Sequence, residues 1–179
     1  RFPFTPLPKQ SEFFDVYDLN TQRYGLNGYI LGAVPGSGKT ASSLMLMAQL
    51  EKDITIVFSP NNALYEVWEN TIDSIKGTKV WVYPKPLNPK IKYTHYVFSH
   101  ENTKFATEVL PQIFNKNRGK SIGIIVDECH RFTELAAAQT NNLINICKMS
   151  NSKDILFMSG TPFKAMGREL IPFIMATDP

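Results

Sequence analysis

The stretch Ala33–Thr40 reads AVPGSGKT and lies between an apolar segment, Tyr29–Leu31, and a segment with helical character that begins at Ala41. A strand, a glycine-rich turn and a helix in this order are the context of a phosphate-binding loop. The glycines let several main-chain N–H groups point at one anion, and the helix N-terminus adds its positive dipole. A glycine-rich turn with a surface lysine is the simpler alternative, but the complete GSGKT run argues against it. The stretch predicts that the chain binds a nucleoside triphosphate.

The residues of this loop have separate predicted roles. Lys39 is expected to reach the β- and γ-phosphates, and the hydroxyl of Thr40 is expected to hold a magnesium ion. Ala33 stands where such a loop usually has its first glycine. The residues predicted to line the nucleotide site are Pro35, Gly36, Ser37, Gly38, Lys39, Thr40 and Ala41.

The composition is that of a soluble globular protein, with 43% hydrophobic and 20% charged residues in a chain of 179. This length favours a single domain over residues 1–179 with a sizeable core. No apolar run approaches the roughly 20 residues that span a bilayer, and the N-terminus does not resemble a signal peptide. Two cysteines without metal-ligand spacing favour an intracellular compartment, either a bacterial or viral-host cytoplasm or a eukaryotic nucleus. The net charge of +3 permits nucleic-acid binding without demonstrating it.

Short apolar segments alternate with segments of helical periodicity, which predicts an α/β fold with a mainly parallel sheet and helices on both faces. Continuous apolar strands are expected where both faces of a sheet are covered. The strands are expected at Tyr29–Leu31, Ile54–Phe58, Lys79–Tyr83, Tyr93–Phe98, Ile122–Val126 and Ile155–Met158. The helices are expected at Ser11–Leu19, Thr40–Leu50, Ala63–Lys76, Asn102–Phe114, Glu134–Met149 and Gly167–Met175.

The expected strand Ile122–Val126 is followed directly by Asp127, Glu128, Cys129 and His130. Ligands of open parallel sheets bind beyond the carboxyl ends of the strands. Asp127 is expected to hold the magnesium ion through its water shell, and Glu128 to polarise the attacking water. An acidic turn after a core strand is common, so Asp127 and Glu128 alone would not indicate catalysis. Their presence in a chain with a phosphate-binding loop favours the catalytic role. His130 is either a catalytic residue or a hydrogen-bonding turn residue, and Cys129 is expected to be a packed side chain.

The order of these motifs resembles that of the superfamily 2 helicases and translocases, and most of all the Swi/Snf-type DNA-dependent ATPases. The AVPGSGKT stretch is similar to motif I of that family, in which alanine at the first position is ordinary. The run from Asp127 to His130 is similar to the DExH form of motif II. The SGTP run that starts at Ser159 resembles motif III, so Ser159, Gly160 and Thr161 are expected to link the nucleotide state to movement between lobes.

Three weaker similarities extend this resemblance over nearly the whole chain. The segment around Gln10 is similar to the family's entry segment, in which a glutamine reads the adenine, with Gln22 as the second candidate. The segments Ile56–Pro60, followed by Leu64 and Trp68, and Tyr96–Glu101 are similar to motifs Ia and Ib, which touch the nucleic-acid backbone. The resemblance assigns that contact to Pro60, Asn61, Ser99 and His100. A strand-ending turn and a helix cap are the simpler alternatives for these segments.

The resemblance implies a RecA-like α/β domain that hydrolyses ATP with Mg²⁺ and couples hydrolysis to translocation on, or remodelling of, nucleic acid, with DNA favoured. Nothing after Pro179 supplies a second RecA-like lobe, so that lobe is the expected partner and the isolated chain is expected to turn ATP over poorly. Another P-loop motor such as a viral packaging ATPase, an RNA helicase lobe and a non-enzymatic scaffold are the alternatives. No membrane partner is expected.

Overall fold

The central feature of the computed structural model, which describes residues 28–32, 38–133 and 137–159, is a six-stranded sheet. Its strands are β1 (Gly28–Gly32), β2 (Ile54–Ser59), β3 (Val80–Val82), β4 (His95–Ser99), β5 (Ile122–Val126) and β6 (Asp154–Ser159). They lie in the order β1-β6-β5-β2-β4-β3, and every neighbouring pair is parallel. All the strands expected from the sequence are therefore confirmed, with ends that differ by at most two residues.

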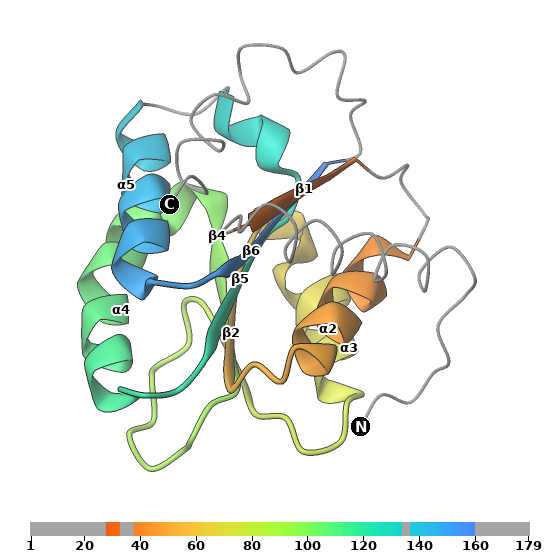
Figure 1. Cartoon of the computed structure of the whole chain (residues 1–179), viewed down its shortest axis with the longest axis vertical. Coiled ribbons are helices and arrows are strands. Elements are labelled where there is room, and N and C mark those ends of the chain that lie inside the picture. Colours follow the sequence, from red (N-terminus) through yellow and green to blue (C-terminus); the bar gives the residue numbers. More distant parts are fainter. Residues whose placement is uncertain (1–27, 33–37, 134–136, 160–179) are drawn as a thin grey trace.

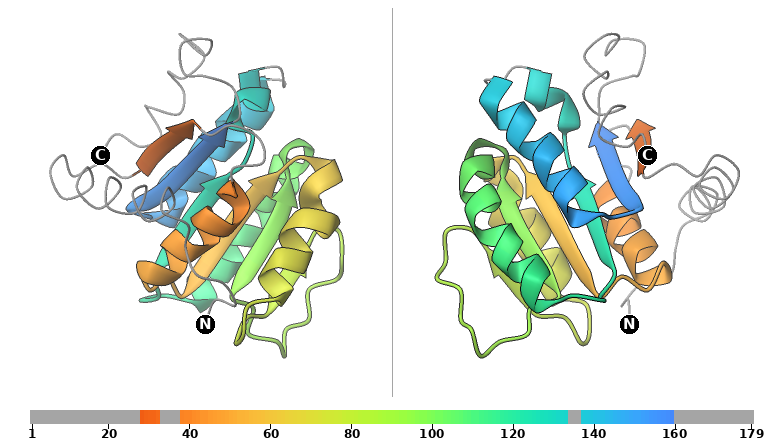
Figure 2. Two further views of the ribbon diagram at one scale, coloured as in Figure 1. Left: turned by 90° about the vertical axis from the view of Figure 1, so that its right-hand side faces the viewer. Right: turned by 60° about the vertical axis from the view of Figure 1, so that its left-hand side comes forward.

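Helices cover both faces of this sheet (Figure 1, Figure 2). The helices α2 (Lys39–Gln49) and α3 (Asn70–Asp73) cover one face, whereas α4 (Thr103–Lys116) and α5 (Ala137–Ser150) cover the other. The predicted α/β class is confirmed. The helices expected at Ser11–Leu19 and Gly167–Met175 lie outside the described residues. None of the helices in the described part of the chain has the length and apolar character that a membrane crossing requires.

Alternation along the central strands produces two hydrophobic cores. In β2, Ile56 and Phe58 pack toward α4 and α5, whereas Val57 packs toward α2. In β5, Ile124 packs toward α4 and α5, and Ile125 packs toward α2. All five of these side chains are buried. Strands buried on both faces need apolar residues at every position, which explains their continuous apolar sequences. The two cores fix the sheet, so that the loops at its edges start from rigid positions.

The sequence predicts one regular helix over Ala63–Lys76, and this prediction is wrong because the helical segment there is irregular. The chain forms a 3₁₀-helix at Asn61–Ala63, then a π-helix at Leu64–Glu69, and only four residues of α-helix in α3. π-Helical turns are rare and are frequently found at functional sites. This irregular segment follows β2 directly and packs on the same face as α2.

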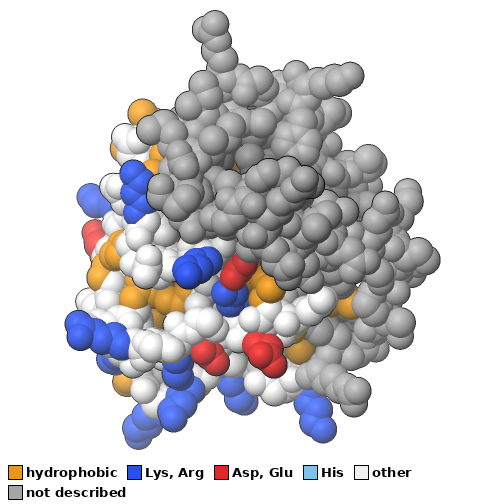
Figure 3. Space-filling model, in the orientation of Figure 1, with side chains coloured by type: hydrophobic (Ala, Val, Ile, Leu, Met, Phe, Trp, Pro, Cys, Tyr) orange, Lys and Arg blue, Asp and Glu red, His pale blue; other side chains and the backbone are white. Residues whose placement is uncertain are grey.

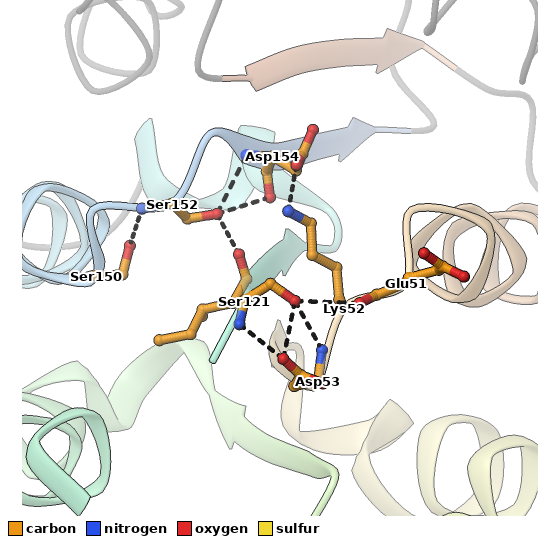
Figure 4. A network of polar contacts seen from close by, with 8 residues as sticks. Glu51, Lys52, Asp53, Ser121, Ser150, Ser152 and Asp154 are labelled. Carbon is orange, nitrogen blue, oxygen red and sulfur yellow. Dashed lines mark hydrogen bonds and ion pairs between the residues drawn. The ribbon is translucent and has the colours of Figure 1, made fainter. Parts of the chain in front are cut away.

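A polar network holds the amino ends of three strands together (Figure 4). Lys52 forms an ion pair with Asp154, and the main-chain N–H of Ser121 donates to Asp53 at 2.9 Å. The hydroxyl of Ser152 donates to the first main-chain carbonyl of β5. These contacts connect the amino ends of β2, β5 and β6. The predicted nucleotide site lies at the opposite edge of the sheet, where the strands have their carboxyl ends.

Candidate nucleotide-binding site

The carboxyl ends of the parallel strands meet at a single edge of the sheet. Gly32 at the end of β1 pairs with Ser159 at the end of β6, and Ser59 pairs with Ser99 in the same way at the ends of β2 and β4. The segments that follow these strands, and the acidic run after β5, therefore start at one edge. Ligands of open α/β sheets bind at this edge.

Gly38 places the first turn of α2 at this edge. Its backbone is left-handed, with φ 77° and ψ 26°, a conformation that only glycine adopts at little cost. The helix begins at the next residue, Lys39, and the main-chain N–H of Ser42 donates to the carbonyl of Gly38 at 2.9 Å. Lys39 and Thr40 thus stand in the first helical turn, where free N–H groups and the helix dipole favour an anion.

Lys39 lies between the two predicted catalytic acids. Its ammonium group is 3.3 Å from Oδ1 of Asp127 and forms a second ion pair with Oε1 of Glu128. The side chains of Lys39 and Asp127 are only 13% and 6% exposed, so solvent screens their attraction weakly. The structure brings Lys39 together with the acidic pair Asp127 and Glu128, which lies far from it in the sequence, as their predicted roles require.

The backbone at Glu128 turns sharply. Glu128 has φ 48°, in the left-handed region that is unfavourable for a residue with a Cβ. Its main-chain N–H donates to Oδ1 of Asp127 at 2.9 Å, which stabilises the turn. A strained left-handed residue persists only where the surrounding fold compensates its cost, as it does at many functional sites. The turn keeps the two neighbouring carboxylates on the same side, toward Lys39.

The oxygen groups of this site fit a magnesium ion. Mg²⁺ is bound by one or two carboxylates together with water and substrate phosphates, rather than by a cage of protein ligands. Asp127 supplies a buried carboxylate, and Thr40 supplies a hydroxyl in the first turn of α2. Within residues 28–32, 38–133 and 137–159, no cluster of three or more His, Cys, Asp and Glu side chains could hold a metal ion by itself.

Cys129 and His130 begin the 3₁₀-helix Cys129–Thr133 that follows the acidic pair. Cys129 is fully buried, and burial together with the nearby Asp127 carboxylate raises the pKa of its thiol to about 12. A thiol with this pKa stays protonated at neutral pH and is neither a nucleophile nor a metal ligand. This agrees with the expected packing role of Cys129, whereas the role of His130 stays a prediction.

The other predicted nucleotide and coupling residues divide into two groups. Ala41 lies partly buried in α2, and Ser159 ends β6 beside β1. The residues that fall outside the described part of the chain are Gln10, Gln22, Pro35, Gly36, Ser37, Gly160 and Thr161. Their predicted contacts with nucleotide, and between lobes, remain predictions.

The residues predicted to touch nucleic acid differ in their exposure. Asn61 has an exposed side chain, but Pro60, Ser99 and His100 are buried. A buried side chain cannot itself reach a phosphate backbone, so a contact at these three positions would have to be made by the main chain, and the predicted contact stays a prediction. The sequence similarity identified segments at the correct edge of the sheet, but the burial of each side chain depends on tertiary packing.

Two partners of Asp127 were not predicted. The indole Nε1–H of Trp68 donates to Oδ2 of Asp127 at 3.3 Å, and Nε2 of His100 lies 2.7 Å from the main-chain oxygen of Asp127. His100 also packs against Phe132, with ring centroids 4.7 Å apart. A buried tryptophan needs an acceptor for its N–H, which is the one sequence signal that pointed to such a contact.

An all-parallel sheet with a helix-borne lysine facing an acidic pair at its carboxyl edge defines a RecA-like P-loop domain. The sequence matches the family described as "Type III restriction enzyme, res subunit" over residues 4–164. The chain belongs to this family, which is part of the superfamily 2 helicases. No curated protein gives a significant match.

Solved structures share the fold at low sequence identity. The Sulfolobus solfataricus SWI2/SNF2 ATPase core in complex with dsDNA has a TM-score of 0.73 and 18% identity, over 99% of this chain and 36% of that one. The DUF1998 helicase MrfA has a TM-score of 0.64 and 18% identity, over 98% and 29%. A nuclease-deletion mutant of the Type ISP restriction-modification enzyme LlaGI, bound to a DNA substrate mimic, has a TM-score of 0.59 and 16% identity, over 89% and 18%. The chain therefore spans about a third or less of these proteins.

Proposed function

We propose that the chain is the ATP-binding lobe of a DNA-dependent ATPase that moves along or remodels nucleic acid. The observation that carries this proposal is the placement of Lys39 against Asp127 and Glu128 at the carboxyl edge of the sheet. Membership of a helicase family supports the reaction, and the RecA-like fold supports the site. A non-enzymatic scaffold has no chemical need for this set of three side chains.

Each residue has a distinct task in ATP hydrolysis. The Lys39 ammonium binds phosphate oxygens and stabilises the charge that develops on them. The Glu128 carboxylate orients a water molecule and accepts its proton. The Asp127 carboxylate, with the Thr40 hydroxyl, holds a magnesium ion. When bound, that ion neutralises charge on the transferred phosphoryl group.

A second RecA-like lobe is part of the proposal. The SWI2/SNF2 core, of which this chain covers 36%, is more than twice as long as the chain. In related phosphoryl-transfer systems an arginine supplied by another domain raises the rate roughly 10³–10⁵-fold. The described arginine nearest in sequence to the acidic pair, Arg131, lies 3.5 Å from Glu101 instead. We therefore expect the isolated lobe to hydrolyse ATP poorly.

DNA is the proposed nucleic-acid partner because two of the similar structures hold DNA or a DNA mimic. Among the described residues on the face shown in Figure 3, lysine and arginine side chains lie singly or in small groups rather than in one dense patch. Together with a net charge of only +3, this distribution favours a few phosphate contacts. Such contacts carry no base identity, so we expect binding that ignores sequence and weakens steeply with salt.

The test measures the ATPase rate of the full-length protein alone and with single-stranded, duplex or branched DNA, or with RNA. Stimulation by DNA, lost in a Lys39→Ala variant, is the expected result. Stimulation by RNA alone would favour the RNA helicase alternative. Hydrolysis that no nucleic acid stimulates would reject the proposed coupling, and a protein without ATPase activity under all these conditions would reject the enzyme itself.

A further inference from the structure

We propose that Trp68 is a positioning residue that orients the Asp127 carboxylate for the magnesium ion and ties it to the segment after β2. This inference rests on the proposed function, since it concerns the same site. It concerns a side chain that makes no predicted contact with nucleotide.

The hydrogen bonds of Asp127 fix the orientation of its carboxylate. Oδ1 faces Lys39 at 3.3 Å and accepts the main-chain N–H of Glu128 at 2.9 Å, whereas Oδ2 accepts the indole N–H of Trp68 at 3.3 Å. Donors on both oxygens prevent the carboxylate from rotating about its last bond. Trp68 is 0% exposed, so its own position is set by core packing rather than by solvent. The buried indole of Trp68 therefore holds Oδ2 of Asp127, the carboxylate oxygen that does not face Lys39.

The irregular helix accounts for the position of Trp68. The residue lies in the π-helix Leu64–Glu69, where hydrogen bonds span one residue more than in an α-helix. The π-turn changes the direction of the side chains around it relative to a regular helix. A π-turn that presents a buried indole to a catalytic carboxylate is consistent with the usual placement of such turns at functional sites.

The same contact connects two parts of the site. The π-helix that carries Trp68 follows the 3₁₀-helix Asn61–Ala63, which begins with the exposed Asn61 just after β2. His100, which follows β4, lies 2.7 Å from the main-chain oxygen of Asp127. The segments that follow the neighbouring strands β2 and β4 therefore both contact Asp127. A displacement of either segment by a bound nucleic acid would be transmitted to the metal-binding carboxylate through a single contact.

Trp81 supplies a matched control for removal of the indole N–H. It is a second buried tryptophan, at 2% exposed, and it donates its Nε1–H to the main-chain oxygen of Lys85 at 2.7 Å. It packs in the core on the opposite face of the sheet, away from Asp127. Trp68→Phe and Trp81→Phe thus remove the same donor and keep an aromatic ring, but only the first affects the carboxylate.

The first measurement is the magnesium concentration that gives half-maximal ATPase activity in the full-length protein. Loss of a hydrogen-bond partner of a metal ligand typically lowers metal affinity 10–100-fold, so we expect Trp68→Phe to raise this concentration about 10-fold. Trp81→Phe should leave it within about 2-fold of the unsubstituted protein, because its acceptor is the main-chain oxygen of Lys85, whose side chain pairs with Glu69 rather than with Asp127. An equal change in both variants, or none in either, would overturn the inference.

The second measurement needs no catalysis. The sequence contains two tryptophans, so ¹⁵N-labelled indole groups of this chain give two N–H signals, and Trp81→Phe identifies that of Trp68. Addition of Mg²⁺ with a non-hydrolysable ATP analogue should shift the Trp68 signal and leave the Trp81 signal in place. Hydrolysis of ATP without a shift at Trp68 would reject the positioning role and keep the proposed function, whereas a protein that does not hydrolyse ATP would reject the function itself.

Discussion

The ammonium group of Lys39 lies 3.3 Å from Oδ1 of Asp127 in a part of the fold where both side chains are nearly buried. Removing one partner of such a pair leaves an uncompensated charge, which costs several times more than loss of an exposed ion pair. Glu128 shares the same lysine, so this single cation pairs with two acids. The site therefore depends on Lys39 both for its electrostatic balance and for its proposed chemistry.

Lys39→Ala should lower the ATP turnover of the full-length protein by at least about 100-fold, because it removes a charge placed at the developing phosphate charge. Lys52→Ala is the control. Lys52 has a similar exposure, 10%, and an ion pair with Asp154, but at the opposite edge of the sheet. We expect Lys52→Ala to lower the free energy of unfolding while the folded protein keeps its turnover. Equal loss of turnover in both variants would assign the effect to stability alone.

Glu128→Gln should separate ATP binding from ATP hydrolysis. The amide keeps the shape of the side chain but cannot accept a proton from water, and loss of a general base typically costs 10²–10⁴-fold in rate. Binding of ATP, measured by isothermal titration calorimetry, should persist, and the bound nucleotide should remain ATP when it is extracted and separated. Extracted ADP in the amount that the unsubstituted protein gives would exclude Glu128 as the base.

The core of the site could be predicted because it follows from sheet geometry. The strand Ile122–Val126 has the predicted bounds, and the parallel sheet brings its carboxyl end to the same edge as the glycine-rich turn. Once both motifs are placed at that edge, a meeting between Lys39 and the acidic pair is a direct consequence. No detail of side-chain packing is needed for that step.

The surroundings of the site could not be predicted because they depend on tertiary packing. Trp68, Ile72 and Ile75 are spaced as on one face of a regular helix and are all buried, so their periodicity predicts an α-helix. The structure instead has a π-turn there, which lets the indole donate to Asp127. The resemblance assigned His100 a contact with nucleic acid and gave no sign of its burial beside Phe132, which depends on the chain turn that follows Asp127.

Gly123→Ala should destabilise the fold without touching the nucleotide site. A Cβ at this position of β5 would overlap Sδ of Met47, which is buried on α2. Overpacking of this kind typically costs about 1–3 kcal/mol, and urea denaturation should show it as a lower transition midpoint. The double variant Gly123→Ala with Met47→Ala removes the overlapping atom. Its two substitutions should cost less together than the sum of their separate effects, and strict additivity would exclude the overlap as the cause.

His95 should make the protein less stable in mild acid. Burial lowers its pKa from 6.5 to about 4 in the folded state, and the ring lies 2.7 Å from the hydroxyl of Thr94. Between those pH values His95 is protonated in the unfolded chain but neutral in the folded protein. The free energy of unfolding is therefore retained above pH 6.5 and falls as the pH drops toward about 4. The loss should amount to about 2 kcal/mol, since one unit of pKa corresponds to about 1.4 kcal/mol and the ring is only partly shielded.

Urea titrations at a series of pH values, compared between the unsubstituted protein and His95→Gln, isolate this effect from the carboxylates that titrate in the same range. Glutamine carries no proton equilibrium, so the difference in unfolding free energy between the two proteins should change by about 2 kcal/mol across the interval and stay constant above it. A difference that did not depend on pH would mean that His95 takes up a proton equally well in the folded and unfolded chains. In that case the start of β4 would have to be open to water in solution.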